Sequence, residues 1–414
     1  MCFTVSMARR PASDLATSGE VFHLIRTGEA VTRAEIGRIT GLSRPAVALR
    51  VQELLAHGLV VERTDGPSTG GRPPVRLEFN ASGGVVLTAA LGVSRTQIAV
   101  CDLAGDEVAR SDGYLDVEES PSVIVPMILD EWDALLGQAG VPASAVRGAA
   151  IGLPATVEFA AGRVQSTRVM AKWNGVAIPP LVAERFRVPL FVDNDVNMIA
   201  LGEHRLVYQG DADDLLFVKV STRIGAGVVA GGQVQRGALG AAGEIAHIPV
   251  REGLGAECRC GNVDCLEAVA SGAALAARLR ELGRTAIRAR DVVALLREGD
   301  PEAEALVRDA GRRLGDVVSM AVNLLNPDVV VLGGDLADAF DPLVAGVREV
   351  VYQRATALAS RRLRINPSSL GERSAVAGCA VLVLDHILAP DAVTHALHAA
   401  PPAAAVPARS AVRA

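Results

Sequence analysis

The chain has 414 residues, half of them hydrophobic and only 3% aromatic, and it carries a formal net charge of −6. This length allows two or three domains with ordinary hydrophobic cores. The overall charge excludes a generally basic nucleic-acid binder, although residues 1–80 alone carry 10 basic and 8 acidic side chains. No uninterrupted apolar run approaches the length that spans a bilayer, so we expect a cytoplasmic protein that does not enter a membrane.

The N-terminal part of the chain is predicted to form a winged helix-turn-helix domain over residues 18–80. Residues 1–17, which lack periodic apolar positions, are expected to be a flexible arm. Apolar residues at helical spacing predict a first helix from Ser18. The pattern from Thr32 to Glu35 is a capping box that opens a second helix, and Ser43 can cap a third.

After the third helix, two alternating segments, 59–62 and 75–79, predict a hairpin around the Gly/Pro loop 66–74. In such a domain the third helix enters the major groove, and an arginine-bearing loop fits a narrow minor groove. The predicted DNA contacts are Ser43, Arg44, Ala46 and Arg50 on the helix and Arg72 in the loop. The alternatives are that these arginines are only solvated surface charges, or that the small domain mediates dimerisation.

The remainder of the chain is predicted to be an α/β body. Strands are expected at 85–91, 97–101, 149–152, 190–193, 215–220, 228–230 and 329–332, and helices at 122–139, 273–283 and 301–325. The hairpin-like segments 87–107 and 216–234 suggest a duplicated unit, and hence two lobes, 81–205 and 206–388, that face a cleft. Residues 389–414 are rich in Ala and Pro and are expected to be a disordered tail.

One imidazole and three thiols lie close together in the second lobe. His247 is followed by Cys258, Cys260 and Cys265, which together supply the Cys3His set that structural zinc prefers. Two cysteines separated by one residue are poorly placed for an ordinary disulfide. We therefore expect one structural zinc; the alternative is a group of unrelated thiols.

Several of these segments resemble the ROK family (repressors, open reading frames and kinases). The stretch 244–247 followed by 258–267 resembles the family signature, 192–197 resembles its catalytic-loop motif, and 330–334 resembles its adenosine-side glycine pair. The winged helix with a Gly-Arg-Pro loop is similar to the transcription-factor branch. The resemblance implies a two-lobed body of the sugar kinase/Hsp70/actin type, which is ribonuclease H-like, with zinc in the Cys3His segment.

The same resemblance implies a sugar pocket lined by Asn194, Asp195, Glu244, His247 and Glu267. Carboxylates and amides suit the paired hydroxyl groups of a sugar. In kinase relatives the residue matching Asp195 is the general base, and His247 would bind zinc through one ring nitrogen and the sugar through the other. The alternative for Asp195 is a capping or turn carboxylate.

The phosphate-binding loops depart from the kinase pattern. Ala90 replaces the metal-organising carboxylate, Val93 replaces a glycine, and Arg223 replaces a glycine of the second loop. The glycines that remain as doubtful nucleotide contacts are Gly225, Gly227, Gly333 and Gly334. We therefore expect neither ATP nor Mg²⁺ to bind and kinase activity to be lost.

Two further departures lie near the expected pocket. Val169 stands where many relatives have Asn, which removes one hydroxyl contact and makes the pocket less polar. The identity of the effector is therefore open between a sugar and a sugar phosphate. Asp264 stands where glycine is usual and is expected to need a positive φ.

The combined prediction is a sugar-responsive regulator, most simply a repressor, that binds a double-stranded DNA operator as a homodimer or homotetramer. One alternative is an ATP-dependent sugar kinase with an appended DNA-binding domain. Another is a scaffold that binds a transport or kinase component through the zinc segment.

Overall fold

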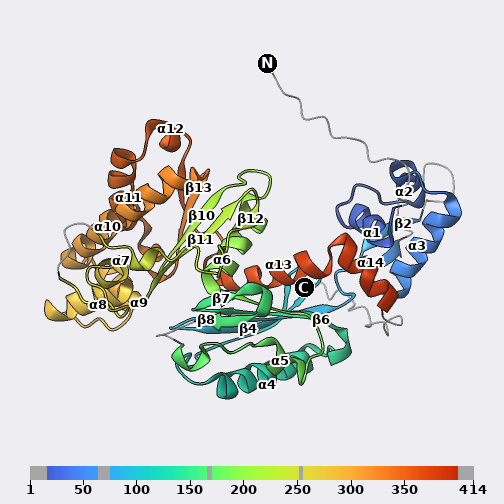
Figure 1. Ribbon diagram of the computed structural model, residues 1–414, viewed down its shortest axis with the longest axis horizontal. Coiled ribbons are helices and arrows are strands. Elements are labelled where there is room, and N and C mark those ends of the chain that lie inside the picture. The colour runs from blue at the N-terminus through green and yellow to red at the C-terminus, as the bar shows by residue number, and fades with distance from the viewer. Residues whose placement is uncertain (1–15, 64–74, 166–169, 251–254, 400–414) are drawn as a thin grey trace.

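The computed structural model describes residues 16–63, 75–165, 170–250 and 255–399. A small N-terminal head is followed by a body with two five-stranded sheets, which lie side by side along the molecule (Figure 1). The predicted fold class, an N-terminal helical head before a two-lobed α/β body, is confirmed. Among the described residues no single helix is long and apolar enough to cross a membrane; only the bent pair 371–387 and 390–399 reaches that length together.

The head consists of three helices and one hairpin. Its elements are α1 (Ser18–Arg26), α2 (Arg33–Thr40), α3 (Arg44–Ala56), β1 (Val60–Arg63) and β2 (Arg76–Phe79), and the two strands pair antiparallel. Thr17 and Glu20 form a capping box at α1, which the sequence analysis did not anticipate. The hydroxyl group of Thr32 accepts from the amide of Glu35 at the start of α2, while the Glu35 carboxylate accepts from the amide of Val31.

The first lobe is built on a sheet with strand order β5-β4-β3-β6-β9. Its strands are β3 (Val85–Leu91), β4 (Thr96–Asp102), β5 (Glu107–Gly113), β6 (Val146–Leu153) and β9 (Leu190–Asn194); β7 (Thr156–Glu158) and β8 (Arg163–Gln165) form a separate hairpin. Helices α4 (Pro121–Ala139) and α5 (Pro179–Ala183) complete the lobe. Every residue of β3 is buried, as expected for the central strand of a sheet that is covered on both faces.

The second lobe repeats this plan with strand order β12-β11-β10-β13-β14. Its strands are β10 (Leu215–Val220), β11 (Ile224–Ala230), β12 (Gln233–Val234), β13 (Val329–Gly333) and β14 (Arg364–Pro367). Its helices are α7 (Leu266–Ala270), α8 (Gly272–Glu281), α9 (Ala289–Arg297), α10 (Pro301–Leu325), α11 (Phe340–Arg354) and α12 (Ala357–Ser360). In both lobes an antiparallel hairpin, β3/β4 or β10/β11, is followed by a parallel strand beside its first member, as the suggested duplication requires.

Two helices join the parts of the molecule. Helix α6 (Asp195–Glu203) packs against β10 and β11 of the second lobe, and α13 (Ser374–Ile387) packs against α6, β3 and β6. The α6–α13 contact is close because Gly202 and Gly378 face each other: a Cβ atom on Gly378 would lie 1.8 Å from the Met198 carbonyl oxygen. The assignment of residues 206–388 to the second lobe is therefore wrong for α13, which covers the first-lobe sheet.

The chain then returns to the head. Helix α14 (Pro390–Ala399) packs against α1, where the Gly19 amide donates to the Thr394 hydroxyl group over 3.1 Å (Figure 1). The expected disordered tail is therefore wrong for Pro390–Ala399, because Val393 is buried in this contact. Residues 400–414 and 1–15 of the expected tail and arm lie outside the described residues.

Candidate functional site

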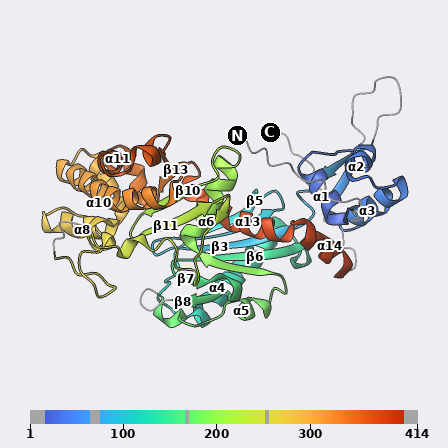
Figure 2. The same ribbon diagram turned by 45° about the horizontal axis from the view of Figure 1, so that its top comes forward.

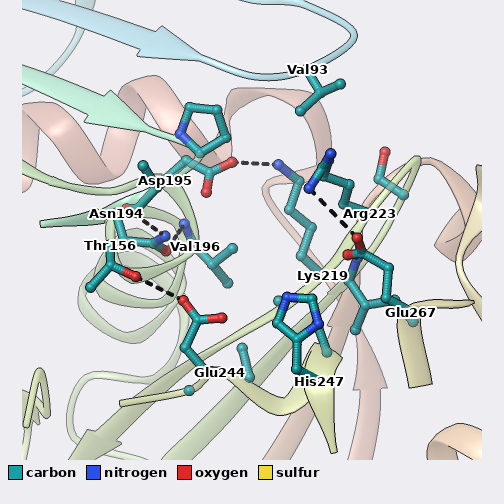
Figure 3. Close-up of a pocket in the computed structure, with 18 of the residues that line it drawn as sticks. Val93, Thr156, Asn194, Asp195, Val196, Lys219, Arg223, Glu244, His247 and Glu267 are labelled. Atoms are coloured by element: carbon teal, nitrogen blue, oxygen red, sulfur yellow. Dashed lines mark hydrogen bonds and ion pairs between the residues drawn. The ribbon is translucent and has the colours of Figure 1, made fainter. Parts of the chain in front are cut away.

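A cavity of about 550 Å³ lies where the two lobes meet (Figure 3). All five predicted sugar-contact residues line it: Asn194, Asp195, Glu244, His247 and Glu267. They come from the start of α6, from the loop after β12 and from the zinc segment, so residues more than 70 positions apart in the sequence line one cavity. A concave site with a few convergent polar groups is the usual form of a small-molecule pocket.

The first wall of the cavity is the junction between β9 and α6. Asn194 is the N-cap of α6: its side-chain oxygen accepts from the Val196 amide at 2.9 Å, and its side-chain nitrogen donates to the Ala155 carbonyl at 3.1 Å. Asp195 follows as the first helical residue, with only 8% of its side chain exposed. Because Asn194 provides the cap, the alternative of Asp195 as a capping carboxylate is not the arrangement found.

Asp195 is paired with a cation that sequence reasoning missed. The Nζ atom of Lys219, near the end of β10, lies 2.6 Å from the Asp195 Oδ2 atom. Lys219 is one of only two lysines in the chain, and it stands two residues before the loop that binds phosphate in kinase relatives. The position of Lys219 could have marked it as a cavity residue from the sequence. Its pairing with Asp195 could not be predicted, because Asp195 lies across the cavity on α6.

Arg223 occupies the turn between β10 and β11 and lies in the same cavity (Figure 3). Its Nη1 atom is 3.5 Å from the Glu267 Oε1 atom, and burial lowers the pKa of Arg223. Glu267 also accepts from the Ile224 amide at 3.3 Å. The arginine that replaces a phosphate-loop glycine therefore lines the same cavity as the predicted sugar contacts and is paired with one of them, Glu267.

Glu244 stands on the opposite side, on a tight turn. The hydroxyl group of Thr156 in β7 donates to its Oε1 atom at 3.0 Å, which links the two lobes across the cavity. The preceding Gly243 has φ +90°, and a Cβ atom there would lie 2.1 Å from the Ala226 carbonyl oxygen. Only glycine fits this position, so the turn holds Glu244 in place.

The four predicted metal ligands come together beside this cavity. One ligand atom from each of His247, Cys258, Cys260 and Cys265 can be chosen so that all four lie within 4.8 Å of one another. The Nδ1 atom of His247 is 3.5 Å from the sulfur of Cys258, and the sulfurs of Cys260 and Cys265 are 3.5 Å apart. Sulfurs held tetrahedrally at about 2.3 Å from zinc are about 3.8 Å apart, so the cluster is consistent with a zinc site.

The backbone of the metal segment matches the prediction for Asp264. Its φ is +57°, one of two positive values at a residue other than glycine in the described chain. The Asp264 carboxylate accepts from the Ala256 amide at 2.9 Å, which closes the loop that carries the cysteines. Aspartate tolerates this conformation at modest cost, so the glycine usual in relatives is not required.

Comparison with known proteins is consistent with this geometry. Residues 86–386 match the ROK family. The chain belongs to the ROK family. It is 32% identical to the putative xylose repressor of Caldicellulosiruptor sp. strain Rt8B.4 over 88% of this chain and 94% of that one. A solved ROK-family transcriptional regulator, a homologue of the Escherichia coli MLC protein, aligns with a TM-score of 0.78 and 25% identity over 92% of this chain and 98% of its own.

The ROK hexokinase of Thermus thermophilus is 28% identical and aligns with a TM-score of 0.58, over 72% of this chain and 98% of its own. The repressor and regulator matches therefore extend over almost the whole chain, whereas the kinase match covers less of it. This ROK chain belongs to the transcriptional-regulator branch of the family.

In this ROK chain a second cavity of about 180 Å³ lies beside the first. Gly333 and Gly334 line it, and a Cβ atom on Gly333 would meet the Phe217 ring at 2.4 Å. Gly225 lines the first cavity instead, and Gly227 packs so tightly on α6 that a Cβ atom would lie 2.6 Å from that of Ala200. Gly225 and Gly227 therefore allow β11 to approach α6 and are not explained by nucleotide contact.

A chain of ion pairs crosses the second cavity. Arg95, from the β3–β4 turn of the first lobe, lies 2.5 Å from Glu372, which is also 2.9 Å from Arg290 on α9 of the second lobe. Arg290 in turn lies 2.9 Å from Asp335, which accepts from the Ser221 hydroxyl group. A hydrogen bond from Arg95 lowers the pKa of Glu372. Both guanidinium groups at the second cavity are thus paired with carboxylates.

The ROK head carries the predicted DNA contacts, but not all in the expected orientation. Ser43 caps α3 and Arg44 is exposed. Arg50 is half-buried and donates from Nε to the Ala16 carbonyl at 2.5 Å, and Ala46 packs partly against the head core. Arg72 lies outside the described residues. The expectation that Arg50 and Ala46 point outward is therefore wrong, because both turn toward α1 and the core.

The exposed residues of α3 are Arg44, which was one of the predicted contacts, and five others: Pro45, Ala48, Leu49, Gln52 and Ala56. Within the head α3 packs against α1, α2 and β1, and it lies at the far edge of the head, away from both sheets (Figure 2). The buried positions Val47, Val51 and Leu54 place the opposite face near Leu49 when each residue turns the helix by about 100°. This periodicity was available in the sequence and could have identified the outward face.

Proposed function

We propose that this ROK protein is a cytoplasmic, sugar-responsive regulator that binds an operator on double-stranded DNA and represses transcription as a homodimer or homotetramer. The observation that carries the proposal is the exposed third helix of the head, joined to a body whose inter-lobe cavity gathers the five hydroxyl-binding candidates. The match to a repressor along 94% of that protein supports it.

In this proposal the cavity binds a sugar or sugar phosphate through Asn194, Asp195, Glu244, His247 and Glu267. The carboxylates accept hydrogen bonds from the hydroxyl groups, and the second ring nitrogen of His247 contacts the sugar while Nδ1 lies beside the Cys258 sulfur. Zinc, when bound, fixes the orientation of that ring. Loss of the metal would then weaken sugar binding and also destabilise the loop that carries the cysteines.

The route from the cavity to DNA runs through helix packing. Asn194 and Asp195 begin α6, α6 packs on α13, and α13 leads into α14, which holds α1 of the head. A ligand that favours one arrangement of the lobes therefore shifts the position of the head. This changes the spacing of two recognition helices in an oligomer and so the affinity for DNA.

An ATP-dependent sugar kinase remains the second candidate, favoured by the match to a hexokinase and by the position of Asp195. Against it, Lys219 holds the Asp195 Oδ2 atom that a general base would use, and the two arginines at the second cavity are paired with carboxylates. Phosphoryl transfer needs cations free to neutralise charge on the phosphates.

Two measurements test the proposal. Fluorescence anisotropy with fragments of the DNA upstream of its own coding region should detect sequence-dependent, salt-sensitive binding. A thermal-shift screen of hexoses, pentoses and their phosphates should find a ligand that raises the melting temperature and changes that DNA affinity. Absence of specific DNA binding, or ADP release with a sugar that Asp195→Asn abolishes, would favour the kinase instead.

A further inference from the structure

We propose that Leu49 and Gln52 of α3 determine operator specificity by contacting a thymine methyl group and a neighbouring adenine in the major groove. This inference rests on the proposed DNA-binding function and specifies how the sequence of the operator is read. It departs from the sequence-based prediction, in which Arg50 had that role.

The position of Leu49 relative to the head core is the first observation. Val47, Val51 and Leu54 are 2%, 0% and 0% exposed and fix the inner side of α3. Leu49 lies opposite them and is 60% exposed. The head buries Val47, Val51 and Leu54 and partly buries Leu55, whereas no described part of the chain covers Leu49 to a similar extent.

The second observation is that the basic side chain next to this face is already bonded. Arg50 donates from Nε to the Ala16 carbonyl at 2.5 Å and from Nη1 to the Ala46 carbonyl at 3.4 Å. Glu53 likewise accepts from the Ser18 hydroxyl group at 2.6 Å. Both side chains therefore join α3 to α1 and the segment before it, and they point away from the groove.

The chemistry of the remaining outward residues then selects the bases. Pro45 and Ala48 offer no side-chain hydrogen bond, and Arg44 lies in the first turn, where with the Ser43 helix end it suits a phosphate group. An apolar side chain reads the C5-methyl group of thymine, and the amide of Gln52 can pair with N6 and N7 of adenine. Leu49 and Gln52 are three residues apart, which is about 4.5 Å along the helix axis. This separation is similar to one base step, about 3.4 Å, so the two side chains can reach neighbouring bases.

The test uses the full-length protein and a library of random 20-base-pair duplexes. The selected site is then synthesised with deoxyuridine replacing each thymine in turn, which removes only the methyl group. We expect one replacement to weaken wild-type binding about fourfold, the equivalent of one buried methyl group. Leu49→Ala should bind the thymine duplex more weakly by a similar factor and lose its sensitivity to that replacement.

Gln52→Ala should lose discrimination at an adjacent adenine, measured with 7-deazaadenine, by about five- to tenfold. Arg50→Ala is the matched control: its site preference should be unchanged whatever its stability, because its guanidinium bonds to Ala16. The inference is overturned if wild-type binding ignores every thymine replacement, or if Leu49→Ala remains sensitive to them. Failure to select any duplex would instead refute the proposed DNA-binding function.

Discussion

The crossing of α6 and α13 gives a sharp test of the fold that connects the cavity to the head. Gly378→Ala would add a Cβ atom 1.8 Å from the Met198 carbonyl oxygen. Because that oxygen belongs to helix backbone, no side-chain rotation can relieve the contact, and the two helices must separate. Overpacking of a tight core costs about 1–3 kcal/mol, and a backbone clash belongs at the upper end; the helix propensity of alanine offsets about 0.5–1 kcal/mol, so we expect a net loss of about 2 kcal/mol.

Gly137→Ala is the matched control. Gly137 lies on the exposed side of α4, and its Cβ atom would meet nothing within 4 Å. Alanine in place of a helical glycine stabilises by about 0.5–1 kcal/mol. Urea unfolding followed by circular dichroism should therefore move the midpoint down for Gly378→Ala and up for Gly137→Ala. If Gly378→Ala unfolds at or above the wild-type midpoint, α6 and α13 do not cross in this way.

Three further predictions concern the metal segment, the cavity and the response to acid. Elemental analysis should find about one zinc per chain, lost in Cys258→Ser and retained in Cys101→Ser, whose thiol is buried in the first-lobe sheet. Lys219→Met should reduce the free energy of unfolding by about 3 kcal/mol, because it leaves the buried Asp195 carboxylate unpaired, and adding Asp195→Asn should recover most of that loss in urea titrations. A hydrogen bond from Arg110 lowers the pKa of Asp112 to about 2. The pKa of an aspartate in the unfolded chain is about 3.9, so ionised Asp112 stabilises the fold above pH 4 and this stabilisation disappears toward pH 2. The difference in unfolding free energy between wild type and Asp112→Asn should therefore shrink over that range.

The sequence predicted those elements whose apolar pattern is long or regular. The helix over 301–325 and the strands over 85–91 and 215–220 were placed with their observed bounds, because burial of one face or both leaves a clear period. Among the strands that were missed, β5 and β14 lie at sheet edges, where half-exposed residues blur the alternation. Helix α14 was missed because Ala and Pro dominate the composition around it, while its stability comes from contact with α1.

The candidate site divides in the same way. Resemblance to a family identified the five residues of the cavity, the types and spacing of His247 and three cysteines identified the metal cluster, and the structure brings each set together. Resemblance could not supply the partners of Asp195 and Glu267, because Lys219 and Arg223 meet them across elements that only the tertiary fold brings together. Helical periodicity could have identified the outward face of α3, but it could not reveal that Arg50 donates to the Ala16 carbonyl, because that acceptor belongs to the backbone before α1.

Under the proposed function, these unanticipated ion pairs explain how the cavity can still bind a sugar after phosphoryl transfer has been lost. Sugar hydroxyl groups need acceptors, and Glu244 keeps its carboxylate at the cavity, where it accepts a hydrogen bond from the Thr156 hydroxyl group. Phosphoryl transfer needs an available carboxylate base and available cations, but Lys219 is joined to Asp195, and Arg95 and Arg290 are joined through Glu372. Each pairing removes one requirement of catalysis without disturbing the first turn of α6. Helix α6 still begins at the cavity and packs against α13. Ligand contact at Asn194 can therefore still act on the head through α6, α13 and α14.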